Sequence, residues 1–239
     1  MQSYRRILLS GLLRTPSGLM NLLQMTVLSY YFGNNGRTPY VHYMLLLGIP
    51  AFLGQLIAAG AAPKLADKHG AATTFARANV FAGLALLAAF ALFLCRPQQL
   101  TQALPFTLLI LLLFCNMFCC GLVNTVQSIL IADAADLTEK ESGIRRDGIF
   151  VSGQSLLIKL STGVSALLQG LVFAISGFSG TAVRQINRAL YAGADFATDP
   201  SFATPRFAMF FLFLCLPGIA YLLSALPYRK GRNPHKAPV

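Results

Sequence analysis

The chain has 239 residues, of which 55% are hydrophobic and only 11% carry a charged side chain. Soluble domains carry about 25% charged residues, so this composition, with a mean hydropathy of +0.61, excludes an ordinary soluble domain and indicates a membrane protein. The formal net charge of +11 would favour a nucleic-acid partner in a soluble protein. In a membrane protein, basic residues report orientation first, and we expect no nucleic-acid binding.

Six apolar segments follow one another, each close to the roughly 20 residues that a helix needs to cross a bilayer. We expect an all-α membrane protein, with a transmembrane domain of six helices over residues 16–228. A cytoplasmic lead-in (1–15) precedes this domain and a basic cytoplasmic tail (229–239) follows it. The longest polar loop is expected over residues 177–206. The six segments are 16–32, 43–62, 78–94, 104–132, 149–175 and 207–226.

The basic residues divide unequally between the two sides of the predicted bundle. Cytoplasmic segments carry an excess of Lys and Arg, so the richer side is placed inside and both termini are cytoplasmic in the plasma membrane. The outer set is Arg37, Arg96, Arg184, Arg188 and Arg206. The inner set is Arg5, Arg6, Arg14, Lys64, Lys68, Arg77, Lys140, Arg145, Arg146, Arg229, Lys230, Arg232 and Lys236.

Lys159 is the one basic residue that falls inside a predicted span. It lies ten residues into the fifth segment, about 15 Å along the helix axis and near the centre of the bilayer. A charge at that depth costs roughly 3 kcal/mol or more and marks an ion or substrate pathway by default. Snorkelling to an interface is the alternative, and it is weak at this depth.

Polar side chains form two strips on the same segment. Ser152, Ser155, Lys159 and Thr162 share one sector of the helix, and Gln154, Ser161 and Ser165 form a second. On the fourth segment Asn124 and Gln127 are three residues apart and share a face. Such strips line a cavity or a helix interface, and for the serines small-residue packing is equally consistent.

No acidic residue of the chain falls inside a predicted span, so Lys159 lacks a partner there. The lysine is therefore either neutral or paired with a carboxylate of another polypeptide. The five cysteines lie within or beside apolar runs without metal-ligand spacing, and we expect neither a metal nor a cofactor. The acidic residues are Asp67, Asp133, Asp136, Glu139, Glu141, Asp147, Asp195 and Asp199.

Several motifs together resemble the signature of the glycoside-pentoside-hexuronide:cation symporters, the melibiose permease-like family of the major facilitator superfamily. The stretches 132–136 (ADAAD) and 143–148 (GIRRDG) are followed by Gln154 and Lys159 in the order and spacing of that signature, which joins the tenth and eleventh helices of a twelve-helix fold. The stretch 60–70 (GAAPKLADKHG) is similar to the superfamily's loop between the eighth and ninth helices.

The resemblance implies that the chain is the C-terminal half, helices seven to twelve, of a sugar or glycoside symporter coupled to Na⁺ or H⁺. It assigns Lys159 to cation coupling, opposite aspartates of six N-terminal helices that the chain does not contain. It places Gln154, Ser155 and Asn124 in the substrate cavity. The cytoplasmic gate would consist of Asp67, Asp133, Asp136, Arg145 and Asp147, with helix-end capping as the alternative for these charges.

We therefore expect no transport by the chain alone, and activity only with an N-terminal six-helix half or by self-association. Two other readings stay open. Asp133-x-x-Asp136 at a helix end has a carboxylate spacing suited to Mg²⁺, which would fit a membrane-embedded prenyl or lipid transferase, although such enzymes need a second acidic motif. The chain could also be a fragment without function of its own. The identity of the sugar does not follow from the sequence.

Overall fold

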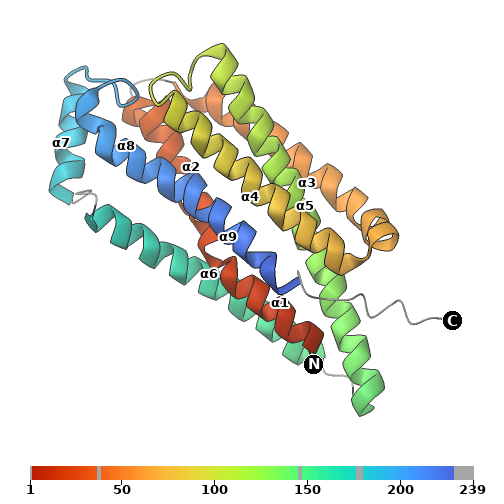
Figure 1. Ribbon diagram of the computed structural model, residues 1–239. Coiled ribbons are helices and arrows are strands. Elements are labelled where there is room, and N and C mark those ends of the chain that lie inside the picture. The colour runs from red at the N-terminus through yellow and green to blue at the C-terminus, as the bar shows by residue number, and fades with distance from the viewer. Residues whose placement is uncertain (1, 37–38, 145–146, 176–179, 229–239) are drawn as a thin grey trace.

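The computed structural model describes residues 2–36, 39–144, 147–175 and 180–228, and all regular structure in these ranges is helical. Long helices run back and forth beside one another, and the first and last described helical segments, at Gln2 and Tyr228, lie at the same end of the bundle (Figure 1). The α-helices are α1 (Gln2–Leu13), α2 (Leu19–Val27), α3 (Val41–His69), α4 (Ala71–Cys95), α5 (Ala103–Ser142), α6 (Asp147–Ile175), α7 (Gly180–Tyr191), α8 (Ala203–Phe210) and α9 (Leu216–Ser224).

Short 3-10 and π segments connect or extend these helices. They are η1 (Thr15–Gly18), η2 (Leu28–Phe32), η3 (Asn34–Gly36), η4 (Pro200–Phe202), η5 (Phe211–Cys215) and η6 (Leu226–Tyr228). The tight turn at Gly70 joins α3 to α4. We call that end of the bundle, which also contains Tyr4 and Tyr228, the Gly70 end. The opposite end, which contains α7, is the α7 end.

Five stretches in the described residues are long and apolar enough to cross a membrane, namely 41–69, 71–95, 103–142, 148–175 and 200–228. They confirm the second to sixth predicted segments. Two of them, 41–69 and 103–142, extend beyond the prediction into acidic sequence, so Asp67, Asp133 and Asp136 lie on the last turns of helices. The predicted first span, 16–32, is absent from this group because its helix is short and interrupted.

The region 2–32 consists of four consecutive helical pieces, α1, η1, α2 and η2. Pro16 has no N–H and restricts the residue before it, which explains the interruption at 14–18. The segment expected as a lead-in is helix α1, and it packs along α6 and α9 within the bundle. Ser10 is fully buried there, and its hydroxyl donates a 2.6 Å hydrogen bond to the Ser224 carbonyl.

Small residues bring the central helices into close contact. The buried positions of α3 are Gly54, Ala58, Ala62 and Ala66, four residues apart on one face, and they pack against α5. A Cβ added at Gly121 of α5 would stand only 2.7 Å from the Gln55 carbonyl oxygen. This is the small-residue packing that lets membrane helices approach without a hydrophobic driving force.

The expectation of a polar loop over residues 177–206 is wrong in one respect, because this segment contains helix α7. Val183, Ile186 and Leu190 recur at helical spacing and turn toward the protein, with Ile186 and Leu190 buried. This periodicity marks an amphipathic helix, too short and too polar to span a bilayer. The α7 ribbon lies across the end of the long helices rather than along them (Figure 1).

Hydrogen bonds tie α7 and the following loop to the end of the first helical region. The hydroxyl of Tyr30 and the amide of Asn35 each donate a 3.0 Å bond to the side-chain oxygen of Asn187. Arg206 is buried and donates to the carbonyls of Phe196 and Ala197. This arginine, counted among outer loop charges from sequence, therefore orders the loop from within α8.

The loop ends in a capped turn. The backbone N–H and hydroxyl of Ser201 both donate to the Asp199 carboxylate, at 2.9 and 2.7 Å. These two bonds favour the ionised form and hold the pKa of that carboxyl below its ordinary value. Asp199 is thereby the N-cap of the helical run that begins at Pro200.

Candidate functional site

A polar cavity of about 380 Å³ lies where the interrupted first region meets α3, α5, α6 and α9. Amides and hydroxyls from these elements face it together with one arginine, Arg14. No carboxylate of the described residues lines it. The polar lining comprises Arg14, Ser17, Asn21, Gln55, Asn124, Gln127, Gln154, Ser161, Thr162 and Tyr221.

Arg14 lies at the break between α1 and η1 and is half-buried in the cavity wall. Its guanidinium donates a 2.6 Å hydrogen bond to the side-chain oxygen of Gln127, which is buried on α5. A guanidinium has five donors, so one bond to an amide leaves others directed at the cavity. The arginine thus supplies the site's positive charge.

Two serines of α6 stabilise the helix break. The hydroxyls of Ser161 and Ser165 donate to the carbonyl oxygen of Thr15, at 2.7 and 3.1 Å. In a lipid-embedded protein a carbonyl freed by a break must find such a partner. Gly18 makes the contact possible, because a Cβ there would stand 2.7 Å from the Ser165 hydroxyl. The helix break is therefore held by specific contacts and is part of the structure of the site.

The α9 side of the cavity presents a phenol and a thiol. The Tyr221 hydroxyl and the Cys120 sulfur lie 3.0 Å apart, and both residues are buried. Cys120 also contacts the side-chain oxygen of Asn116, one turn earlier on α5, at 3.8 Å. Because the hydroxyl and the thiol are paired with each other, this wall offers a bound molecule a fixed shape and only weakly polar groups.

Of the residues expected in the substrate cavity, Asn124 and Gln154 line it and Ser155 does not. Ser155 and Lys159 are exposed on another face of α6. Tyr4 and Leu157 explain this rotation of α6: a Cβ at Gly153 would overlap the Tyr4 hydroxyl, and Leu157 packs against Gly11. Lys159 forms no hydrogen bond or ion pair with the described part of the chain.

The residues expected in the gate lie at the Gly70 end. Asp67 is exposed near the end of α3, and Asp133 and Asp136 are exposed on the last turns of α5. Arg145 and the side chain of Asp147 lie outside the described residues. The structure therefore shows three of these charges on one end of the bundle, with no ion pair among the three. Their role as a gate stays a prediction.

Sequence reasoning missed Arg14, which it counted with the cytoplasmic charges, and gave no role to Tyr221, Gln55 or Ser17. A signal was present: Arg14 stands beside a Thr-Pro-Ser-Gly stretch between two apolar runs. Interrupted membrane helices with Pro or Gly at the break typically form binding sites in transporters. Within the described residues no cluster of His, Cys, Asp and Glu could hold a metal ion.

Five apolar helices long enough to span a bilayer, folded around a polar cavity, define a polytopic membrane protein. Residues 1–230 match the family described as MFS/sugar transport protein, so the chain belongs to that family and to the major facilitator superfamily. That family is one of transporters rather than enzymes, which argues against the Mg²⁺-dependent transferase considered from the sequence.

A curated relative is the uncharacterized 29.9 kDa protein in the crtE 3' region of Pseudescherichia vulneris, 26% identical over 189 residues. The match covers 79% of this chain and 62% of that protein, so the aligned part is about three fifths of the relative's length. No solved structure matches the chain significantly.

Proposed function

We propose that the chain forms one half of a secondary transporter that moves a sugar or glycoside together with Na⁺ or H⁺. The observation that carries this proposal is the cavity around Arg14. Side-chain amides and hydroxyls both donate and accept hydrogen bonds, as do the hydroxyl groups of a sugar. Five side-chain amides line a space of about 380 Å³, within the usual range for a small-molecule site; they belong to Asn21, Gln55, Asn124, Gln127 and Gln154.

The half-transporter proposal is supported by the exposed face of α6. Ser152, Ser155 and Lys159 are exposed on α6, and Lys159 forms no hydrogen bond or ion pair within the described residues. A lysine and two serines are a poor surface to present to lipid, because a charge in hydrocarbon is costly. A second bundle that supplies carboxylates would satisfy them. That bundle would be an N-terminal half of the family or a second copy of this chain.

We further propose that α1, η1, α2 and η2 together form the sixth membrane span. The run 2–32 contains 31 residues by its numbering, about 46 Å at 1.5 Å per residue, which exceeds the bilayer core. Arg14 would then lie within the membrane rather than in a lead-in. The predicted orientation, with both termini in the cytoplasm of the plasma membrane, is retained, and the Gly70 end is its inner side.

Substrate protection of an introduced thiol tests the site. In a variant whose five native cysteines are serines, Asn124→Cys should react with a water-soluble maleimide when a family N-terminal half is co-expressed. A transported glycoside should slow this reaction several-fold. Glu141→Cys, exposed at the Gly70 end of the same helix and outside the cavity, serves as the control. If no glycoside that is taken up slows the reaction of Asn124→Cys, the assignment of Asn124 to the substrate cavity is contradicted.

A further inference from the structure

Two apolar grooves flank α4 at the Gly70 end of the bundle. The larger, about 640 Å³, lies between α4, α3 and α5, and the smaller, about 480 Å³, lies between α4 and the end of α9 with η6. Arg77 and Phe81 line both grooves. Phe81 is 61% exposed and forms the ridge between them. Arg77 is therefore a cation shared by two apolar grooves, and we call its position the head of the grooves.

The larger groove lies on the opposite side of α5 from the polar cavity. Cys115, Phe118 and Leu122 line the groove, whereas Cys120 and Asn124 line the cavity. At about 100° per residue the two sets are centred roughly 180° apart on the helix. In a membrane protein whose substrate site is polar, the apolar groove on the far side faces lipid.

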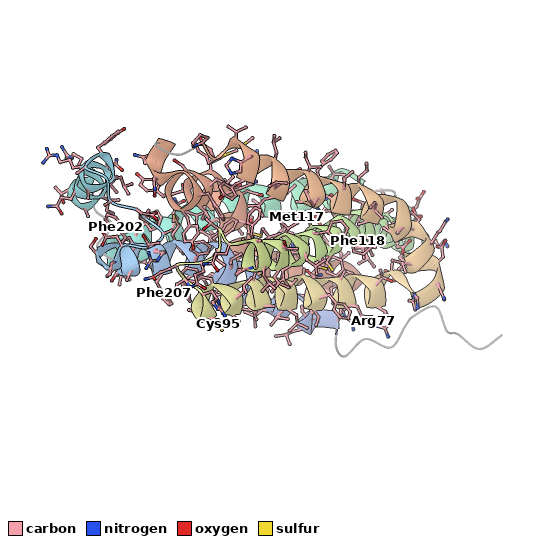
Figure 2. All side chains as sticks on the ribbon, turned by 90° about the horizontal axis from the view of Figure 1, so that it is seen from above. Arg77, Cys95, Met117, Phe118, Phe202 and Phe207 are labelled. Atoms are coloured by element: carbon pink, nitrogen blue, oxygen red, sulfur yellow. The ribbon has the colours of Figure 1, made fainter. Side chains whose placement is uncertain are left out.

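The head of the grooves carries unused positive charge. Arg77 is exposed and has no hydrogen bond or ion pair with any described residue, and His69 of α3, which lines the larger groove, is equally unpaired in that part of the chain. The neighbouring Thr74 is not available, because its hydroxyl already donates a 3.0 Å bond to the Leu65 carbonyl. Figure 2 shows Arg77 toward the end of α4, well away from Cys95 at the other end of that helix.

We propose that Arg77 binds the phosphate of an anionic two-chain phospholipid whose acyl chains lie in the two grooves, one on each side of Phe81. The guanidinium fork matches phosphate oxygens in a bidentate arrangement. The grooves add van der Waals contact along both chains, since the surrounding lipid is itself apolar and gives no hydrophobic driving force. The occupant has two chains because two grooves share one head, and it is anionic because Arg77 and His69 lack an acidic neighbour in the larger groove's lining. The proposal depends on membrane embedding and is independent of what the cavity transports.

Native mass spectrometry of the purified full chain tests the site, with dioleoylphosphatidylglycerol added in detergent. We expect one retained lipid per chain, and about tenfold or more weaker binding for Arg77→Gln, the usual effect of losing a charged hydrogen bond. Arg96→Gln is the matched control, because Arg96 lies at the other end of α4 and bonds to the Gln99 side chain. It should retain the lipid as the unmodified chain does.

Two further ligands distinguish the occupants. Lysophosphatidylglycerol, with one chain, should bind several-fold more weakly, and glycerol 3-phosphate should not compete. Equal binding of the lipid by Arg77→Gln, or equal loss in Arg96→Gln, would overturn the proposal. Competition by glycerol 3-phosphate would show a free-phosphate site instead. A chain that binds no lipid and associates with a second copy only when Arg77 is intact would show that a protein covers this face.

Discussion

The Arg14 guanidinium and the Gln127 side-chain oxygen are joined by a 2.6 Å hydrogen bond that links the interrupted first region to α5 across the polar cavity. Gln127 is buried, so loss of the arginine leaves an amide oxygen that only cavity water could satisfy. The bond also fixes the direction in which the remaining guanidinium donors point. It therefore connects the stability of the bundle with the geometry of the site.

A double-mutant cycle on this pair measures the connection. Arg14→Met alone should lower the free energy of unfolding by about 1–3 kcal/mol, because it strands a buried acceptor. Gln127→Leu alone should lower it by a similar amount, and the double variant should cost clearly less than the sum. Denaturation of the purified chain in detergent, followed by circular dichroism, gives the values. Additivity within about 0.5 kcal/mol would show that the two residues act independently.

The helix break should depend on α6 serines in a redundant way. Ser161→Ala or Ser165→Ala alone should be mild, because the other hydroxyl still donates to the Thr15 carbonyl. The double alanine variant leaves that carbonyl unsatisfied and should cost about 1–3 kcal/mol. Ser152→Ala is the control on the same helix, since its hydroxyl bonds only to the Ile149 carbonyl one turn earlier. A double variant as stable as the single variants would remove the serines from our account of the break.

Close packing of α3 on α5 gives a stability prediction with opposite signs at two glycines. Gly121→Ala places a methyl group 2.7 Å from the Gln55 carbonyl and should destabilise the chain by about 1–3 kcal/mol. Gly60→Ala on α3 meets no atom within 4 Å and should be neutral or stabilise by up to about 1 kcal/mol through helix propensity. Thermal unfolding of the two variants in the same detergent checks the difference. Equal effects would mean that the α3–α5 contact is looser than described.

Five of the six predicted spans were predictable from sequence, because about 20 apolar residues in a row have few other stable locations. The position of Arg14 was not predictable in this way, because counting positive charges treats each arginine as a loop residue. The Thr-Pro-Ser-Gly break that follows Arg14 allows this arginine to enter the bundle. Helix α7 was missed because a search for continuous apolar runs passes over a segment whose few apolar residues are spaced periodically within polar sequence. The exposure of Lys159 depends on how α6 packs on Tyr4 and Gly11, which no local pattern encodes.

Lys159 should therefore behave differently alone and in an assembled transporter. Because it is exposed without a partner in the described chain, Lys159→Ala should change the stability of the lone chain by less than about 0.5 kcal/mol. In a pair with a family N-terminal half, its loss would leave facing carboxylates uncompensated and should abolish the effect of Na⁺ or H⁺ on sugar binding. Lys140→Ala, exposed near the end of α5, should do neither. Intact coupling with a destabilised lone chain would make Lys159 a packing residue.

The most direct measurement is cation-driven uptake of radiolabelled glycosides into proteoliposomes, by the chain alone and by the chain co-expressed with a family N-terminal half. We predict uptake only for the pair, because the cavity wall of one bundle is half of a site formed between two. We predict its loss in the pair when Asn124 and Gln154 are both alanine, with assembly unchanged by size-exclusion chromatography. Uptake by a demonstrated monomer, or full activity of the double variant, would contradict the account.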